Sequence, residues 1–524
     1  MEKPISFGEL DFRIVASMER AQSKPDPETP FRICIMGDFS GRENRKLYES
    51  VSAPSENRPI EVDRDNIESV MEKLGVEVQI PLAGVSQPPV AIQFTELDDF
   101  HPEQIYARLD VFKALRDTRK KLSDPSTFES TKKEVQGWAG EIVSPGPSET
   151  VLEHSTPPPT PPEPPAGSIL DQIVDQSEGP IPDAGTMAAP SDWDDFLHKI
   201  VGPHLVPGED PEQERLVAAV DASISGLMNA VLHDSGFQSL EAAWRALRFL
   251  VSRAETDERL RIYLLDLSKQ DLIEDLESSD DLRSTGLYRI FVEHAKGTLG
   301  GDPWALLAGD YTFDKTRRDI QALGRMARIA AVADASFVSA ANTRFLGCDS
   351  LAEATPNPDD WSNPFDDETD EDWKALRSLK EASYLGLALP RFLLRLPYGA
   401  DTDPVDYFDF EEMPGAPVHE HYLWGNPAFA CALLLARAFS HKGWDLRPSM
   451  MQDLEGLPLH IYKDQGETII KPCAEVVLTE KAMEKILEFG LMVLLSFKSQ
   501  DKIRLARFQS VSDPARNLTG PWDH

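Results

Sequence analysis

The 524-residue chain has little cysteine and a shortage of basic side chains. Its four cysteines lie far apart without a C-x-x-C pair, so their spacing indicates neither a zinc knuckle nor a disulfide framework. Reduced, buried thiols are the expected state. Lysine and arginine total 53 against 89 aspartates and glutamates, and the formal net charge of −36 would repel nucleic acid and anionic membrane surfaces. Neither is therefore an expected partner.

Long hydrophobic runs are also missing. The N-terminus, MEKPISFGEL, lacks the apolar segment of a secretory signal, and an apolar stretch such as 489–495 is far shorter than the roughly 18 residues of a membrane span. These absences predict a cytoplasmic protein without direct membrane insertion. A content of 41% apolar and 27% charged residues fits a globular chain, and the length favours two or three domains.

The stretch PFRICIMGDFSGR, residues 30–42, is an apolar strand pattern followed by a turn with two glycines. A phosphate loop would need the spacing G-x-x-x-x-G-K-[ST], and a dinucleotide fingerprint would need G-x-G-x-x-G at the start of a helix. The stretch has neither spacing.

Proline is concentrated in one place. Nine prolines fall between Pro145 and Pro165, where each removes a backbone donor and fixes φ near the polyproline II value. The segment therefore predicts an extended spacer of about 3.1 Å per residue between a small and a large module. A role of PPPTPPEPP as a peptide ligand is the less favoured alternative.

Before the spacer, GELDFRIV alternates apolar and charged residues as a half-buried strand does, and the polar run 20–28 leaves it free to pair elsewhere. The patterns that follow predict strands at 31–36, 76–80 and 90–94 and helices at 67–74 and 102–121. They suggest a compact α/β unit.

After the spacer, apolar stripes predict helices at 217–231 and 237–251. Strand and helix patterns then alternate at 260–267, 270–276, 304–308, 317–333 and 337–340. This alternation predicts a mixed α/β fold.

Candidates for chemistry are few. In an extended segment His419 and His421 would point the same way and could share a metal ion, but no third ligand is identifiable, and absence of a metal site is favoured. Arg391 and Arg395 are expected either to extend their charged ends to solvent along an apolar surface or to pair with the surplus acids. Since no pattern assembles a nucleophile, a base and an oxyanion donor, we expect no enzyme activity and no cofactor.

Longer strings carry a family resemblance. The first module resembles the small sheath subunit of the bacterial type VI secretion system, TssB or VipA, through PFRICIMGDFSGR, RPIEVDRDNIESVM and IQFTELDDFHPEQIYARLDVFKALRDTRKKL. The second resembles the large sheath subunit, TssC or VipB, through VLHDSGFQSLEAAWRALRFLVSR, LLDLSKQDLIEDLE, GTLGGDPWALLAGDYTF, YLGLALPRFLLRLPYGADTDPVDYFDFEE and HYLWGNPAFACALLLARAF. The strings are collinear with the family over about 30–125 and 168–511.

The resemblance implies a fusion of both sheath subunits in one chain. The implied parts are an interlocking arm at 1–20, a small-subunit module at 29–140, a proline-rich linker at 141–167, an unfoldase-recognition-like helix and linker at 168–190, and a C-terminally shortened large-subunit module at 191–524. It also implies that the turn at 37–42 follows the first core strand of the family and has no nucleotide role.

The function that the resemblance implies is structural. The family builds a helical tube of sheath subunits around an inner tube, and contraction of the sheath ejects that inner tube. The implied partners are copies of the chain or other sheath subunits, an Hcp-like inner tube protein, a baseplate and a ClpV-like AAA+ unfoldase in the bacterial cytoplasm.

Two segments are assigned through the same resemblance. The interlocking arm, donated to a neighbouring subunit, is placed on Leu10, Phe12, Ile14 and Val15; the alternative is an ordinary edge strand of its own domain. The unfoldase-binding helix is placed on the apolar face made by Leu170, Ile173 and Val174; the alternative is a short helix docked on its own domain.

The sequence departs from the family at its end. The large subunit of the family continues past the match to FQSVSDP, with a final stretch that completes the strand exchange, whereas this sequence ends at His524. We therefore keep two alternatives to a self-sufficient sheath protomer: a separate polypeptide that supplies the missing part, and a non-contractile adaptor or cap that joins the sheath to a baseplate.

Overall fold

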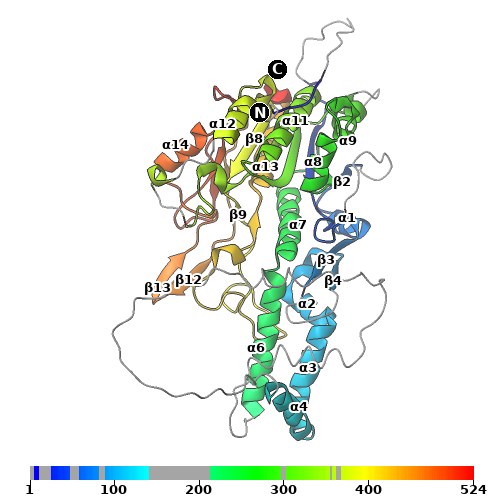
Figure 1. Ribbon diagram of the computed structural model, residues 1–524, viewed down its shortest axis with the longest axis vertical. Coiled ribbons are helices and arrows are strands. Elements are labelled where there is room, and N and C mark those ends of the chain that lie inside the picture. The colour runs from blue at the N-terminus through cyan, green and yellow to red at the C-terminus, as the bar shows by residue number, and fades with distance from the viewer. Residues whose placement is uncertain are drawn as a thin grey trace, which may run out of the picture. The chain divides into compact units, whose positions relative to one another are not determined.

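The computed structural model describes most of the chain as helices, strands and turns (Figure 1). The described residues are 5–10, 25–47, 58–81, 89–140, 213–296, 302–353, 357–361 and 367–523. Contacts divide the chain into two compact units, one made of Met1–Leu109 with Ser225–His524 and the other of Asp110–Ile224.

The first unit is built on a nine-stranded sheet with the order β11-β15-β14-β8-β7-β6-β1-β5-β2. Its strands are β1 (Phe31–Gly37), β2 (Ile60–Val62), β5 (Leu260–Asp266), β6 (Leu306–Phe313), β7 (Ser336–Ala341), β8 (Leu385–Leu389), β11 (Asp453–Leu454), β14 (Met492–Ser496) and β15 (Ile503–Leu505). The run from β14 to β5 is parallel, while β2, β15 and β11 pair antiparallel at the edges. The predicted α/β class is thereby confirmed.

Smaller sheets and several helices complete this unit. The two-stranded sheets are β3 (Val76–Ile80) with β4 (Val90–Phe94), β9 (Phe392–Leu393) with β10 (Trp424–Gly425), and β12 (Ile461–Asp464) with β13 (Glu467–Ile470). The helices are α1 (Ile67–Leu74), α2 (Pro102–Arg108), α7 (Ser235–Arg253), α8 (Lys269–Glu277), α9 (Gly286–Tyr288), α10 (His294–Lys296), α11 (Arg317–Ala333), α12 (Asp367–Arg377), α13 (Pro427–Lys442) and α14 (Glu480–Glu488).

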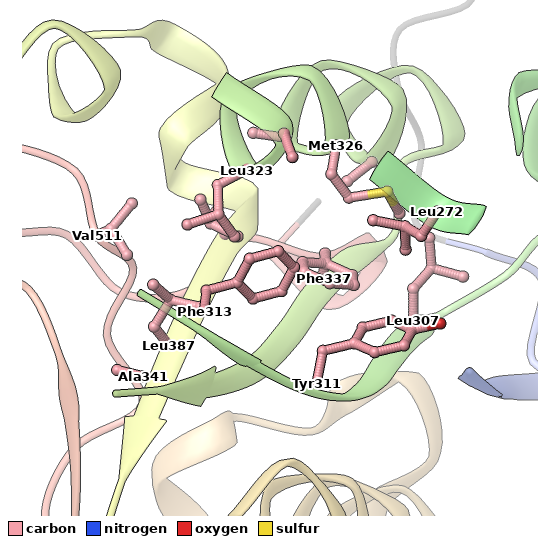
Figure 2. Close-up of a cluster of buried hydrophobic side chains, with 14 of the residues drawn as sticks. Leu272, Leu307, Tyr311, Phe313, Leu323, Met326, Phe337, Ala341, Leu387 and Val511 are labelled. Carbon is pink, nitrogen blue, oxygen red and sulfur yellow. The ribbon is translucent and has the colours of Figure 1, made fainter. Parts of the chain in front are cut away.

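Helices cover both faces of the large sheet. Helix α11 packs on β6, β7 and β8 together with α8, and Figure 2 shows the apolar side chains that fill this layer, among them Leu323, Met326 and Phe337. Helix α13 packs on strands from β5 to β8 and on α7. Because α13 is apolar on nearly all sides, it is buried almost throughout, as expected for a helix enclosed between a sheet and another helix.

The central position of β1 is the feature that the sequence did not reveal. Phe31 to Gly37 pair with Leu260 to Asp266 of β5, and Ile33 to Met36 pair with Leu306 to Gly309 of β6. Strands that precede the proline-rich segment thus complete a sheet whose other strands follow it. The sequence analysis grouped β1 with its neighbours in sequence into a compact α/β unit, whereas β1, which is buried on both faces, pairs with β5 and β6.

The described residues of the second unit are largely helical. The unit contains α3 (Asp110–Ser123), α4 (Phe128–Gly140) and the first part of α6 (Gln213–Leu232). The side chain of Gln213 donates a hydrogen bond to the Leu122 carbonyl over 2.7 Å. Arg119 and Asp221 form an exposed ion pair. The helix predicted at 102–121 is therefore two helices, α2 and α3, separated at Leu109, whose backbone is extended.

Helix α6 is long and apolar enough to cross a membrane by length and composition. Half of the apolar part of α6 is buried inside the protein. The core helix of a globular protein shows the same property. One such helix among the described residues is weak support for a membrane span.

The cysteines agree with the expectation of reduced thiols. All four are free, with Cys34, Cys431 and Cys473 buried and Cys348 partly buried. Burial is the main reason that the pKa of the Cys431 thiol rises to about 12, which keeps it protonated.

Candidate functional site

The turn after β1 binds a carboxylate of its own chain. Asp266, the last residue of β5, accepts hydrogen bonds from the backbone N–H groups of Phe39 and Ser40 over 2.8 and 3.0 Å. Its second oxygen accepts from the Ser40 hydroxyl over 2.7 Å and from Nε of Arg42 over 3.0 Å. The amides that would cradle a phosphate in a nucleotide-binding turn therefore hold Asp266, and the turn locks β1 to β5.

Two further contacts fix this turn. Gly41 has φ +80°, and a Cβ there would lie 2.2 Å from the carbonyl oxygen of Glu77, so only glycine fits. Trp244 of α7 donates its indole N–H to the Phe39 carbonyl over 2.8 Å. The turn is thus a structural joint between β1, β3 and α7.

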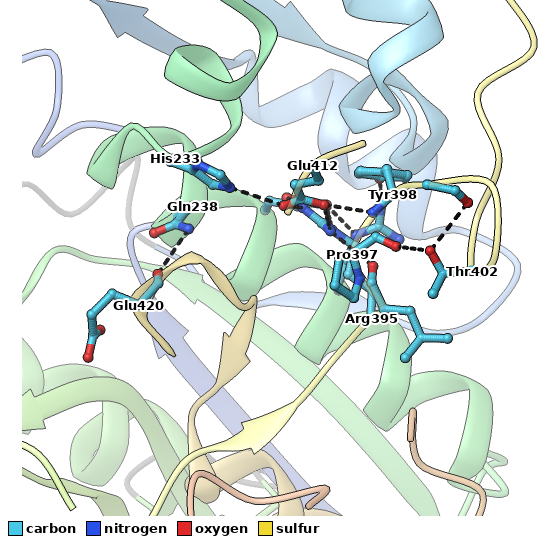
Figure 3. Close-up of polar contacts among 12 residues, drawn as sticks. His233, Gln238, Arg395, Pro397, Tyr398, Thr402, Glu412 and Glu420 are labelled. Carbon is cyan, nitrogen blue, oxygen red and sulfur yellow. Dashed lines mark hydrogen bonds and ion pairs between the residues drawn. The ribbon is translucent and has the colours of Figure 1, made fainter. Parts of the chain in front are cut away.

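A buried ionic cluster joins α7 to the segment 395–412 (Figure 3). Nε of Arg395 lies 2.9 Å from Oε1 of Glu241, and its Nη1 lies 2.8 Å from Oε2 of Glu412. Both glutamate side chains are fully buried, and that of Arg395 is 8% exposed. A buried arginine between two carboxylates is favourable only where the geometry satisfies all three groups, which this one does.

Outer residues complete the cluster. Arg245 donates to Oε1 of Glu241 over 2.7 Å and to the Tyr398 hydroxyl over 3.0 Å. The backbone N–H of Tyr398 donates to Glu412 over 2.8 Å, and Nε2 of His233 lies 3.4 Å from the same carboxylate. Two arginines thus face two glutamates, so the formal charges balance.

The cluster sets the protonation of Glu412. Burial alone would raise the pKa of this carboxyl, but the charge of Arg395, the nearby His233 ring and the hydrogen bonds from Arg395 and Tyr398 lower it to about 2 from its ordinary value of 4.5. Burial is the largest influence on Tyr398 and raises the pKa of its phenol to about 12. At neutral pH the glutamate is charged and the tyrosine is neutral.

A second glutamate is held in the same way. Arg391 lies 2.7 Å from Glu475 and 3.5 Å from Glu420. Burial would raise the pKa of Glu475, but His419 and Arg391 lower it to about 2. Both arginines of the RFLLR string therefore pair with acids, the second of the two expected arrangements.

The stability of the protein should fall in acid. Glu412 and Glu475 have pKa values of about 2 when folded against 4.5 ordinarily, so both stabilise the folded state above pH 4.5 and lose this contribution as the pH falls towards 2. We expect the midpoint of urea unfolding to decrease over this window. Glu412→Gln should weaken the pH dependence, whereas Glu411→Gln, at an exposed neighbour, should leave it unchanged. An equal slope in all three proteins would contradict this assignment.

The metal alternative for His419 and His421 assumed that both residues lie in an extended segment, and this assumption is wrong. The two residues lie in a 3₁₀ turn. His419 contacts Glu475 at 3.3 Å and Lys471 at 3.0 Å, whereas His421 stacks on His233 with 3.8 Å between ring centroids. Among the described residues, no group of three or more His, Cys, Asp or Glu side chains could hold a metal ion.

The described part of the predicted arm, residues 5–10, packs against other residues of its own chain. The ring of Phe7 packs over Gly324 of α11, where a Cβ would lie 2.1 Å from it. The Glu9 N–H donates to the Asp280 carbonyl over 2.6 Å, and the Leu282 N–H donates to the Glu9 carbonyl over 3.2 Å. Leu10 is partly buried against the core.

The other residues that the sequence analysis assigned to the arm and to the unfoldase-binding helix are not among the described residues. Phe12, Ile14 and Val15 of the arm lie outside the described residues, as do Leu170, Ile173 and Val174 of the unfoldase-binding helix. Both assignments stay predictions.

The ionic cluster was missed by the sequence analysis, although a signal for it was present. Glu241 lies four residues after Phe237 and three before Trp244, within the apolar stripe of α7. A charged residue on a buried helix face is rarely found without a partner. This position therefore indicated a buried ion pair, but the partners Arg395 and Glu412 are too distant in sequence to be recognised.

Comparison with known families gives two matches that divide at the proline-rich segment. Residues 214–512 match the family model described as VipB, the EvpB-type tail sheath N-terminal domain. Residues 13–149 match the model described as VipA of the type VI secretion system. The type VI secretion system sheath protein TssC1 of Pseudomonas aeruginosa is 36% identical over 308 residues, which are 58% of this chain and 62% of that protein. The chain thus spans less than two thirds of this relative.

Proposed function

Because the chain belongs to the type VI secretion tail sheath family, with a VipA domain and a VipB N-terminal domain in one polypeptide, we propose that it is a protomer of a contractile sheath. In this proposal copies of the chain assemble into a helical tube around an Hcp-like inner tube in the bacterial cytoplasm. Contraction of the tube then ejects the inner tube. The family is one of structural proteins, and the proposed role requires no chemical turnover.

The shared sheet is the observation that carries the proposal. Strand β1 comes from the VipA region, yet it lies between β5 and β6 of the VipB region. The two sheath regions therefore contribute strands to one sheet, and their presence in one chain fixes their ratio at one to one. Every protomer of a helical lattice built from this chain would therefore contain both the VipA and the VipB region.

The physics of a contractile tube suits such a unit. A contact between two different surfaces of the same protein does not close on itself and generates an open helix. Contraction can then draw on many small gains at repeated interfaces, because packed interfaces switch between discrete arrangements.

The arm is proposed to link neighbouring protomers. Residues 5–10 are anchored on their own protomer by Phe7 and by the backbone hydrogen bonds of Glu9. Alternating Phe12 and Ile14 would then pair with a sheet edge of the next protomer. A baseplate and a ClpV-like unfoldase that grips Leu170, Ile173 and Val174 are further proposed partners.

Electron microscopy of the purified chain tests the proposal. We expect long tubes, whereas discrete particles would favour an adaptor or cap over a sheath.

Deletion of residues 1–18 should abolish the lateral linkage between protomers and with it the tubes. Ile14→Asp should have the same effect because it places a charge on the apolar face of the arm, while Arg13→Asp on the alternate face is the matched control. Tubes that form equally in all of these variants would contradict the role of the arm.

A further inference from the structure

Two histidines that are distant in sequence stack on each other beside the ionic cluster. The rings of His233 and His421 are 3.8 Å apart between centroids and are inclined by 15°. His233 directly precedes Asp234, the residue that caps the N-terminus of α7. His421 is the last residue of the 3₁₀ turn at 419–421. The stack of His233 on His421 therefore holds this turn against the start of α7.

The turn lies at the protein surface. Val418, which precedes it, is 50% exposed, and the side chain of Glu420 is 63% exposed. Within the turn, the His421 N–H donates to the Val418 carbonyl over 3.2 Å. Gln238 of α7 donates to the Glu420 carbonyl over 3.3 Å (Figure 3). The stack and this long hydrogen bond thus link a surface turn to α7, and such links open more easily than core packing does.

Of the two rings, that of His233 is held more firmly. Its side chain is 12% exposed, and its Nε2 lies 3.4 Å from the carboxylate of Glu412 (Figure 3). Glu412 is bound in turn by Arg395 and by the backbone N–H of Tyr398. A proton on His233 therefore faces a fixed carboxylate, whereas His421 is carried by the surface turn.

A proton on His421 meets less favourable surroundings. Burial is the main reason that the pKa of His421 is lowered, and the charge of His233 lowers it further. Glu412 and Glu420 act in the opposite direction, but the Glu420 carboxylate lies 3.5 Å from Arg391, which offsets its charge. Two imidazolium rings at a stacking distance repel each other, so the doubly charged stack is unstable.

Other titratable groups lie near the turn and have to be distinguished from the stack. His419 lies 3.3 Å from Glu475 and 3.0 Å from Lys471. The ring of His460 forms a hydrogen bond of 2.7 Å with the Tyr422 hydroxyl, and burial is the main reason that the pKa of His460 is lowered. Both histidines are bound to groups other than the stacked pair, so substitutions can separate their responses.

We propose that the stack of His233 on His421 is a pH switch that releases the turn 418–421 from α7 in acid. When both rings carry a proton, their like charges separate them, and His421 moves outward with the turn while His233 stays beside Glu412. The pKa of His421 is lowered from 6.5, so the switch is closed at neutral pH and opens below pH 6.5. Because the pKa of Glu412 is about 2, the ionic cluster keeps its charges as the switch opens. The switch lies within one protomer and operates whether or not the chain forms tubes.

Hydrogen–deuterium exchange of the full chain, followed by mass spectrometry of peptides that cover 413–424, measures the release of the turn. After correction for the chemical exchange rate, we expect the protection of these amides to fall about tenfold between pH 7.5 and pH 5.0. His421→Phe keeps a flat ring for the stack but takes no proton, so its protection should be equal at both pH values. His441→Gln, at an exposed position near the end of α13, is the matched control and should behave like the unchanged protein.

Equal protection of the unchanged protein at both pH values would overturn the switch. A loss in acid that persists in His421→Phe would also overturn it and assign the response to His419 or His460.

An NMR titration of the ¹³C-histidine-labelled chain measures the coupling between the two rings, and it decides the matter if His421→Phe lacks protection at every pH. The His421 signal is identified by its absence in His421→Phe, and we expect its midpoint below pH 6.5. Removing the neighbouring charge in His233→Phe should raise this midpoint by about 0.5 pH unit or more. His233→Gln gives a second reading with a smaller side chain. A His421 midpoint that stays the same in both variants would mean that the rings do not sense each other, and the switch would be refuted.

Discussion

Replacing Arg395 with methionine should lower the free energy of unfolding by about 3–5 kcal/mol, the usual cost of removing one partner of a buried ion pair. Glu241 and Glu412 are fully buried and would be left facing each other without the charge between them. Arg245 would still reach Glu241, so Glu412 would lose most. Methionine keeps a similar length and apolar stem, and the loss therefore reports the charge rather than a cavity.

The matched control is Arg344→Met. Arg344 also contacts two acids, Asp314 and Asp349, but its side chain is 57% exposed against 8% for Arg395. An exposed pair of this kind contributes about 0–1 kcal/mol. Urea unfolding of both variants, followed by far-UV circular dichroism, measures the difference. Similar losses in the two proteins would mean that the cluster does not stabilise the fold as the geometry indicates.

Cutting the chain within 150–160 should leave two fragments that remain together under native conditions. Strand β1 belongs to the first fragment, and it pairs over its whole length with β5 of the second and along its middle with β6. Introducing a protease site there and running the cut protein on a size-exclusion column tests this. We expect one peak at the intact size and two bands on a denaturing gel.

The same geometry predicts that residues 168–524 expressed alone will aggregate, because their sheet would lack a central strand and expose β5 and β6 edges. Co-expression with residues 1–150 should restore solubility. Ile35→Asp in β1 should abolish this rescue, whereas Ile35→Val should retain it. Soluble, monomeric 168–524 would contradict the central role of β1.

Local elements were predictable because their signals lie within a few residues. The helix expected at 317–333 is α11, and the strands expected at 76–80 and 90–94 are β3 and β4. Each depends on the spacing of apolar residues over one or two turns or pleats. The break at Leu109 escaped notice because Ile105, Leu109 and Phe112 keep helical spacing through it.

The order of the strands was not predictable in the same way. An apolar strand such as β1 fits any parallel sheet, and its partner β5 begins more than 200 residues later in the chain. Nothing in FRICIMG specifies that neighbour. The resemblance to two sheath subunits identified the two parts correctly. A tether between two modules suggests independent folding, but strands of both parts lie in one sheet.

The place of β1 also has a consequence for synthesis in the cell. At about 5–20 residues per second, a ribosome needs on the order of tens of seconds to add the chain between β1 and the end of β6. During that time an apolar strand emerges before either of its neighbours exists. Chaperones that bind nascent chains should therefore be needed early, and slowing translation after residue 40 should reduce the yield of native protein.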